Sequence, residues 1–276
     1  MPEGRLRLFL ILCRTADFGT AIILKKMHAA EIGARIMDLS LASVVRRLQY
    51  VFRRTAAVNL KRIPQVDLCD LIGKPVIRVD GSYSYVDGSL PWNDIVALMS
   101  LLVDRSPRSV VEVGTFNGYT TRLMSLNLPD AEIHTIDLPE NYGDDGKGMP
   151  KDDWHLISAR RVGSQYRADP SVKNVRQHFG DTAQLVFPPA EAFFIDGSHT
   201  YAYARNDTEK ALASPEARLL VWHDCNMDHP GVTRWLTEMI HSGYPVRHIR
   251  GTNLATLDLP RRDTSTSAQL SRQAID

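Results

Sequence analysis

Apolar and polar positions follow a regular pattern from residue 91 to residue 259. Apolar runs bounded by turn residues predict strands over 109–115, 131–138, 175–180, 192–196, 218–224, 246–250 and 254–259. Apolar positions at helical spacing predict helices over 93–104, 119–128, 182–187, 201–213 and 232–242. Strands that alternate with helices predict an α/β domain with a mostly parallel sheet and helices on both faces. The short turn at 251–253 predicts that the last two strands pair antiparallel, at the edge of the sheet.

The segments outside this pattern divide the chain into three predicted parts. Residues 1–90 form a basic N-terminal extension and connecting lobe, residues 91–260 form the α/β domain, and residues 261–276 form a disordered tail. Within the extension, 28–54 has the spacing of an amphipathic helix, which either packs on the body or a second subunit, or lies on a membrane surface. The segment 139–174 is long and polar, which is typical of a lid or binding loop.

Charge is distributed unevenly along the chain. Residues 1–64 carry a net charge of +8 and the remaining residues a net charge of −7. A mildly acidic body argues against a nucleic-acid groove. The three cysteines, Cys13, Cys69 and Cys225, have neither zinc-site spacing nor an even count, so a reducing, cytoplasmic compartment is expected. No apolar run reaches the ~20 residues of a membrane span.

The most informative motif is a strand, a glycine turn and a helix over residues 110–128. The strand carries Glu112 at its end, and the turn that follows has glycine at Gly114 and Gly118. Glycine lets the backbone approach a ligand closely. A carboxylate at this point favours hydroxyls or a cation over phosphate, because phosphate would be repelled. A nucleoside with a positively charged tail therefore fits this turn better than a dinucleotide.

Acidic side chains also lie at the ends of the following strands. Asp137 closes the second strand, where a carboxylate can accept hydrogen bonds from both hydroxyls of a ribose. The third strand ends at Gly180, Asp181 and Thr182. Asp181 either contacts a ligand there or serves only as a helix cap or turn residue.

Two further strand ends combine carboxylates with histidines. Asp196 ends one buried strand, with His199 three residues later, and His223 and Asp224 end the next strand. Neighbouring strands lie ~4.8 Å apart, so the two aspartates could share one divalent ion, whereas without a cation they would repel or one would protonate. Mg²⁺ suits oxygen ligands, whereas imidazole favours a softer metal such as Mn²⁺. The alternative is that no metal binds and His223 is itself a base or a supporting group.

These motifs together resemble class I S-adenosylmethionine (SAM) methyltransferases, in particular the metal-dependent O-methyltransferases of the catechol and macrolide-sugar types. The resemblance spans roughly residues 91–259. It implies a Rossmann-like, mostly parallel seven-stranded sheet with one antiparallel edge strand. It implies that Asp137 binds the ribose and that Asp181 accepts from the adenine amine. The residues expected to contact the cofactor are Glu112, Gly114, Thr115, Asn117, Gly118, Asp137, Leu138, Gly180, Asp181, Thr182 and Asp196.

The same resemblance implies a chemistry for the histidine-containing strand ends. Asp196, His223 and Asp224 correspond to the metal ligands, and His199 corresponds to the base that takes the proton of the acceptor hydroxyl; Asp196 and His199 are the expected catalytic residues. His223 departs from the family, which has an acidic residue there. The expected function is O-methylation of a hydroxyl on a sugar or natural-product molecule, with SAM as cofactor and Mg²⁺ or Mn²⁺ assisting. The alternatives are a non-catalytic SAM-binding or scaffold protein and an NAD-dependent oxidoreductase; Phe116 in the glycine turn counts against the oxidoreductase.

Overall fold

The computed structural model describes residues 57–79, 83, 85–140, 142 and 161–260 of the chain. The predicted helix over 28–54, the tail from residue 261 and most of the predicted lid lie outside the described residues. The described residues all belong to one compact unit. No helix within the described ranges is long and apolar enough to cross a membrane.

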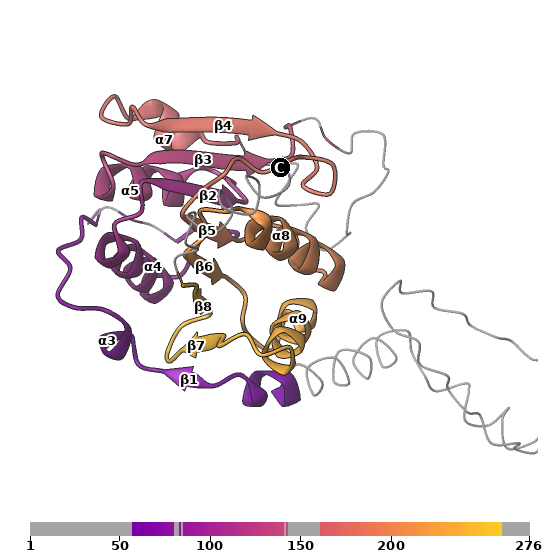
Figure 1. Cartoon of the computed structure of the whole chain (residues 1–276). Helices are drawn as coiled ribbons and strands as arrows, with labels where there is room; N and C mark the ends of the chain where they lie inside the picture. The colour runs from indigo at the N-terminus through magenta and orange to yellow at the C-terminus, as the bar shows by residue number, and fades with distance from the viewer. Residues whose placement is uncertain (1–56, 80–82, 84, 141, 143–160, 261–276) are drawn as a thin grey trace, which may run out of the picture. The chain divides into compact units, whose positions relative to one another are not determined.

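One mixed sheet organises this unit (Figure 1). Its order is β1-β7-β8-β6-β5-β2-β3-β4. The strands are β1 (Gln65–Val66), β2 (Ser109–Val113), β3 (Glu132–Asp137), β4 (Val175–Phe179), β5 (Ala192–Ile195), β6 (Leu219–Trp222), β7 (Arg247–Ile249) and β8 (Ala255–Asp258). β8 pairs antiparallel with both β6 and β7, and every other pairing is parallel. The predicted α/β fold with a mostly parallel sheet is therefore confirmed.

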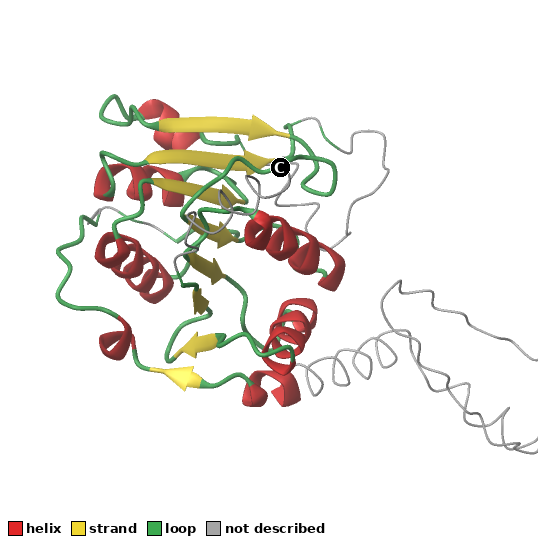
Figure 2. Cartoon of the chain, viewed as in Figure 1, coloured by secondary structure: helices red, strands yellow, loops and turns green. Residues whose placement is uncertain are grey.

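Helices cover both faces of the sheet (Figure 2). They are α3 (Leu68–Leu71), α4 (Trp92–Arg105), α5 (Tyr119–Asn127), α7 (Ser164–Ala168), α8 (Tyr201–Ala213) and α9 (Pro230–His241). Alternate residues of β5 enter opposite cores: Phe194 packs with the apolar side chains of α4 and α5, and Phe193 packs with those of α8 and α9. Both phenylalanines are 1% exposed, as expected for a central parallel strand buried on both faces.

The sheet differs from the prediction in two details. It has eight strands rather than seven, because Gln65 and Val66 pair with β7 and form the outermost strand. The reversed strand β8 pairs with both β6 and β7, so it lies inside the sheet and not at its edge.

The predicted helix over 182–187 is wrong, because this segment forms only a turn. The backbone amides of Gln184 and Leu185 both donate to the carbonyl of Asp181, which closes a single turn. Two prolines follow at 188 and 189, and proline lacks the amide hydrogen that a continuing helix needs. The ammonium of Lys210 then binds the carbonyl oxygens of Thr182 and Leu185 in place of further helical amides.

Candidate active site

A cavity of about 450 Å³ opens at the carboxyl ends of the parallel strands. Its walls come from the segments that follow β2, β3, β4, β5 and β6, together with residues before α4. Ligands of open α/β sheets bind at this edge, and the volume lies within the ~300–1,000 Å³ of small-molecule sites. The residues that line it are Tyr85, Asp87, Gly88, Ser89, Pro91, Val113, Gly114, Phe116, Ile136, Asp137, Leu138, Tyr142, Gly180, Asp181, Thr182, Asp196, Gly197, Ser198, His199, Tyr203, His223, Asp224, Asn226, His229 and Asn253.

The glycine turn after β2 is held close to two neighbouring strand ends. Gly114 has a left-handed φ of +97°, and a Cβ on it would lie 2.0 Å from the carbonyl oxygen of Asp196. The backbone amide of Phe116 donates to Oδ2 of Asp137 over 2.8 Å, and the amide of Leu138 donates to its Oδ1 over 2.6 Å. These contacts fix the Asp137 carboxylate at the rim of the cavity.

The structure divides the predicted cofactor residues into two groups. Those that line the cavity are Gly114, Asp137, Leu138, Gly180, Asp181, Thr182 and Asp196. Those that are not among its lining residues are Glu112, Thr115, Asn117 and Gly118.

The residues of the second group make contacts within the fold around the cavity, and their cofactor contacts stay predictions. A Cβ on Gly118 would lie 2.7 Å from Cα of Gly163, so this glycine lets α5 and the start of α7 approach. Asn117 accepts from the amide of Tyr119 with its Oδ1 at the start of α5. The hydroxyl of Thr115 lies 2.6 Å from that of Thr135, in the interior.

Glu112 is fully buried beneath the glycine turn. Its Oε2 accepts hydrogen bonds from the hydroxyls of Thr121 at 2.5 Å and Thr135 at 2.6 Å. Burial raises the pKa of Glu112 to about 8, although the two hydroxyl donors oppose this shift. The carboxyl group is therefore largely protonated at neutral pH and holds β2, β3 and α5 together.

Replacing Glu112 by glutamine should flatten the pH dependence of stability. The folded-state pKa is about 8 against an ordinary value of 4.5, so the folded state binds more protons between these values. Stability from this group is complete below pH ~4.5 and falls as the pH rises through ~8, by at most ~1.4 kcal/mol per unit. Denaturant unfolding at pH 5, 7 and 9 measures this, and an equal loss of stability with pH in E112Q and wild type would contradict the assignment.

Asp181 lines the cavity and also stabilises the turn that follows β4. Its Oδ1 accepts from the amide of Ala183 at 2.8 Å, which is the turn role that the sequence left as an alternative, and from the hydroxyl of Tyr203 at 3.0 Å. Burial, together with the hydrogen bond to Asp181, raises the pKa of Tyr203 to about 12. Tyr203 is thus a stable donor in the wall of the cavity.

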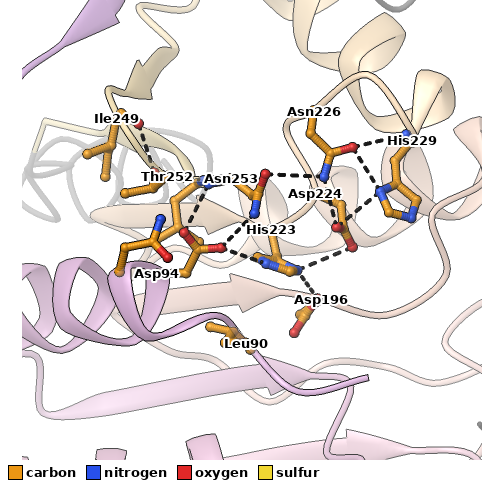
Figure 3. Close-up of polar contacts among 12 residues, drawn as sticks. Leu90, Asp94, Asp196, His223, Asp224, Asn226, His229, Ile249, Thr252 and Asn253 are labelled. Carbon is orange, nitrogen blue, oxygen red and sulfur yellow. Dashed lines mark hydrogen bonds and ion pairs between the residues drawn. The ribbon is translucent and has the colours of Figure 1, made fainter. Parts of the chain in front are cut away.

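His223 lies between carboxylates from three parts of the chain (Figure 3). Its Nδ1 is 2.9 Å from Oδ1 of Asp196 and 3.2 Å from Oδ2 of Asp224. Its Nε2 is 3.0 Å from Oδ2 of Asp94, which belongs to the first turn of α4. Burial alone would lower the pKa of His223, but the charge of Asp196 and the hydrogen bonds to all three carboxylates raise it well above its ordinary value.

Asp224 joins this group to two more histidines. Its Oδ2 is 2.6 Å from Nε2 of His199, and its Oδ1 is 3.0 Å from Nδ1 of His229. Burial opposes ionisation, but hydrogen bonds from His199, His223 and His229 outweigh it and hold the pKa of Asp224 well below its usual range. Asp224 also has a left-handed φ of 56°, and such strained non-glycine residues cluster at functional sites.

The donor set of these side chains fits a divalent cation. Within the described part of the chain, ligand atoms of Asp196, His223 and Asp224 lie within 4.8 Å of one another, as do those of His199, Asp224 and His229. Burial raises the pKa of Asp196, the neighbouring Asp224 adds to the increase, and His223 opposes it. Two buried carboxylates that repel in this way are stabilised by a cation between them.

Three residues of this network carry no functional prediction from the sequence: Asp94, His229 and Asn253. Asp94 lies in the first turn of a helix, where acidic residues are common for their interaction with the helix dipole. Asn253 lies in the turn between β7 and β8, and asparagine is frequent in turns. For His229, the short spacing after Asp224 was the one feature of the sequence that could have indicated its place in this network.

Known proteins resemble the central part of this chain. A protein-family profile described as a methyltransferase domain matches residues 111–225. A search of curated proteins finds no match. Among solved structures, the O-methyltransferase TomG from Streptomyces achromogenes, in complex with SAM, is 17% identical, covers 67% of this chain and 92% of its own, and has a TM-score of 0.47. The SAH-bound methyltransferase PaMTH1 from Podospora anserina is 12% identical, covers 80% and 97%, and has a TM-score of 0.45.

The matched segment runs from β2 to the residue after Asp224. It contains the glycine turn, Asp137, Asp196, His199 and the paired strand ends. Residues 111–225 therefore match a methyltransferase domain, and the resemblance to methyltransferases predicted from the sequence is confirmed.

Proposed function

We propose that this domain is a SAM-dependent O-methyltransferase that modifies a hydroxyl of a sugar or natural-product small molecule. The observation that carries this proposal is the charge of the cavity. Five aspartates line it, and none of the described lining residues is lysine or arginine. Such a wall suits the cationic sulfonium of SAM and repels the pyrophosphate of a dinucleotide. The NAD-dependent alternative therefore has no support from the site.

The chain's own residues would place and activate the two reactants. Asp137, held by the amides of Phe116 and Leu138, would accept the ribose hydroxyls of the cofactor. SAM supplies a sulfonium methyl that is already electrophilic, so alignment and proton removal are the work left to the protein.

His199 would accept the proton of the acceptor hydroxyl. Its Nε2 lies 2.6 Å from Asp224, and this carboxylate would stabilise the imidazolium that forms. Asp196, Asp224 and Nδ1 of His223 would hold a divalent ion, Mg²⁺ or Mn²⁺. When bound, the ion would stabilise the alkoxide form of the acceptor.

A small-molecule acceptor is favoured over nucleic acid, since the described cavity wall has no lysine or arginine for a phosphate backbone. A cytoplasmic location stays a prediction from the sequence. Association through the N-terminal helices also stays a prediction, because residues 1–56 lie outside the described ranges.

Replacing Asp137 by alanine tests the cofactor assignment. Loss of a charge-assisted hydrogen bond should weaken SAM binding by ~1–3 kcal/mol, or roughly 5- to 150-fold in Kd. Isothermal calorimetry with SAM and with NADH measures this directly. Asp130→Ala changes the same residue type at an exposed turn outside the cavity and serves as the control. Binding of NADH rather than SAM by the wild type, or equal SAM affinity in D137A and D130A, would refute the assignment.

Removal of divalent ions tests the metal assignment. A chelator should lower turnover by ~100-fold or more, since metal stabilisation of a developing alkoxide contributes several kcal/mol. SAM affinity should not change, because the ribose site at Asp137 is separate from the carboxylate pair. Turnover is measured after dialysis against chelator and again after Mg²⁺ or Mn²⁺ is restored. Full activity in the chelated protein would refute the metal assignment and would not affect the cofactor assignment.

A further inference from the structure

We propose that Asp94 is a positioning residue that orients His223 as a metal ligand. The proposal rests on the metal site of the proposed function and assigns the group that holds that ligand in place. Asp94 comes from the first turn of α4 and lies 129 residues before His223 in the chain. It is not among the residues that line the cavity, so it would act through His223 rather than on a reactant.

The burial of Asp94 requires compensating donors. Its exposed fraction is 0%. A carboxylate without water is costly unless hydrogen bonds and a positive partner offset the loss of solvation. The backbone amide of Asn253 donates to Oδ1 over 3.0 Å, and Nδ2 of Asn253 donates to Oδ2 over 3.0 Å. Nε2 of His223 lies 3.0 Å from the same Oδ2 and completes the set (Figure 3).

This arrangement decides which ring nitrogen of His223 faces the aspartate pair. A carboxylate accepts hydrogen bonds, so Nε2 of His223 must carry a hydrogen toward Asp94. Nδ1 is then the ring nitrogen that faces Asp196 and Asp224, at 2.9 and 3.2 Å, and its lone pair is available to a metal ion once the proton on it is lost. A metal ion at this point would take the place of the proton that Nδ1 otherwise shares with the two carboxylates. Histidine ligands of metals commonly donate their other N–H to a carboxylate, which is the position that Asp94 occupies.

The turn between β7 and β8 supports the same orientation. Asn253 gives both of its donors to Asp94, so it holds the carboxylate in one rotamer. The turn itself is closed by the hydroxyl of Thr252, which donates to the carbonyl of Ile249 over 2.8 Å. The ligand orientation therefore depends on α4, β6 and the β7–β8 turn together.

Titration of the full-length chain with Mn²⁺, followed by the electron paramagnetic resonance signal of free Mn²⁺, tests the proposal. Asp94→Asn retains the size of the side chain but removes its charge and turns a donor toward Asn253 or His223. Loss of such a supporting group is expected to weaken Mn²⁺ binding by ~10- to 100-fold. SAM affinity and the thermal midpoint should stay close to wild type. Asp104→Asn makes the same change in the last turn of α4, outside the cavity lining, and should bind Mn²⁺ as the wild type does.

A second variant covers the case in which D94N does not fold. Asn253→Ala keeps the Asp94 carboxylate and its backbone donor but removes the side-chain donor, so Mn²⁺ binding should weaken by several-fold. The proposal is overturned if D94N, or N253A where D94N is unfolded, binds Mn²⁺ as tightly as the wild type. It is also overturned if Mn²⁺ and SAM affinity fall together with the thermal midpoint, since that is the result of a general structural role. If the wild type binds SAM but no Mn²⁺, the metal site and this inference both fail while the cofactor assignment holds.

Discussion

Replacing His199 by alanine is expected to lower kcat by ~10²- to 10⁴-fold, the usual contribution of a general base. The reason is geometric. His199 lines the cavity, and its Nε2 is paired at 2.6 Å with a carboxylate whose pKa is held well below its usual range, so that partner stays ionised and stabilises an added proton. The measurement is methyl transfer from SAM to a screened hydroxyl acceptor, with SAM affinity determined in parallel.

The control for this variant is His241→Ala, which removes an exposed histidine in the last turn of α9. It should leave both kcat and SAM affinity unchanged. A H199A protein that binds SAM normally and retains wild-type kcat would remove His199 from the mechanism and favour a non-catalytic SAM-binding protein. A loss of SAM affinity equal to the loss of kcat would show that His199 contributes to binding instead of proton transfer.

Replacing Gly114 by alanine is expected to destabilise the fold by ~3–5 kcal/mol, in the upper range for single substitutions, and to abolish SAM binding. Two effects add. The left-handed φ of +97° costs a non-glycine residue ~1–2 kcal/mol. The new Cβ would also lie 2.0 Å from the backbone oxygen of Asp196, and a main-chain oxygen in a central strand end cannot move without displacing the site.

Gly243→Ala is the matched control for the cost of placing a non-glycine residue at a left-handed φ. Gly243 has a φ of +91°, but a Cβ there meets nothing within 4 Å. Its cost should therefore be ~1–2 kcal/mol, with SAM binding intact. Chemical denaturation and calorimetry of both variants separate the two effects. Equal losses of stability in G114A and G243A would show that the contact with Asp196 does not contribute to the loss of unfolding free energy.

The strand ends were predictable from the sequence because two simple physical rules apply to them. An apolar run sets where each strand stops, and parallel strands present their carboxyl ends at one edge of the sheet. These rules predicted that Asp137, Asp196 and Asp224 would lie at this edge, and all three line the cavity. The pairing of β5 with β6 also brings Asp196 and Asp224 together as expected.

The contacts made by the residues around the glycine turn could not be predicted, because a motif does not specify which of its residues face inward. Glu112 and Thr115 point into a buried network with Thr135, and Gly118 is required by the approach of Gly163. The residues that these side chains contact come from β3 and from the start of α7, so they cannot be predicted from the local sequence pattern.

The sequence by itself determined the α/β order, the residues at each strand end and the mixture of carboxylates and histidines at two of them. These features depend on local apolar periodicity, which fixes where strands and turns form. Only the tertiary structure decided which groups surround His223. Asp94 reaches His223 from α4, 129 residues away along the chain, and Asn253 of the β7–β8 turn donates to Asp94. Those contacts arise from the packing of buried elements, where the cost of leaving a carboxylate without partners selects one arrangement, and no local pattern encodes that cost.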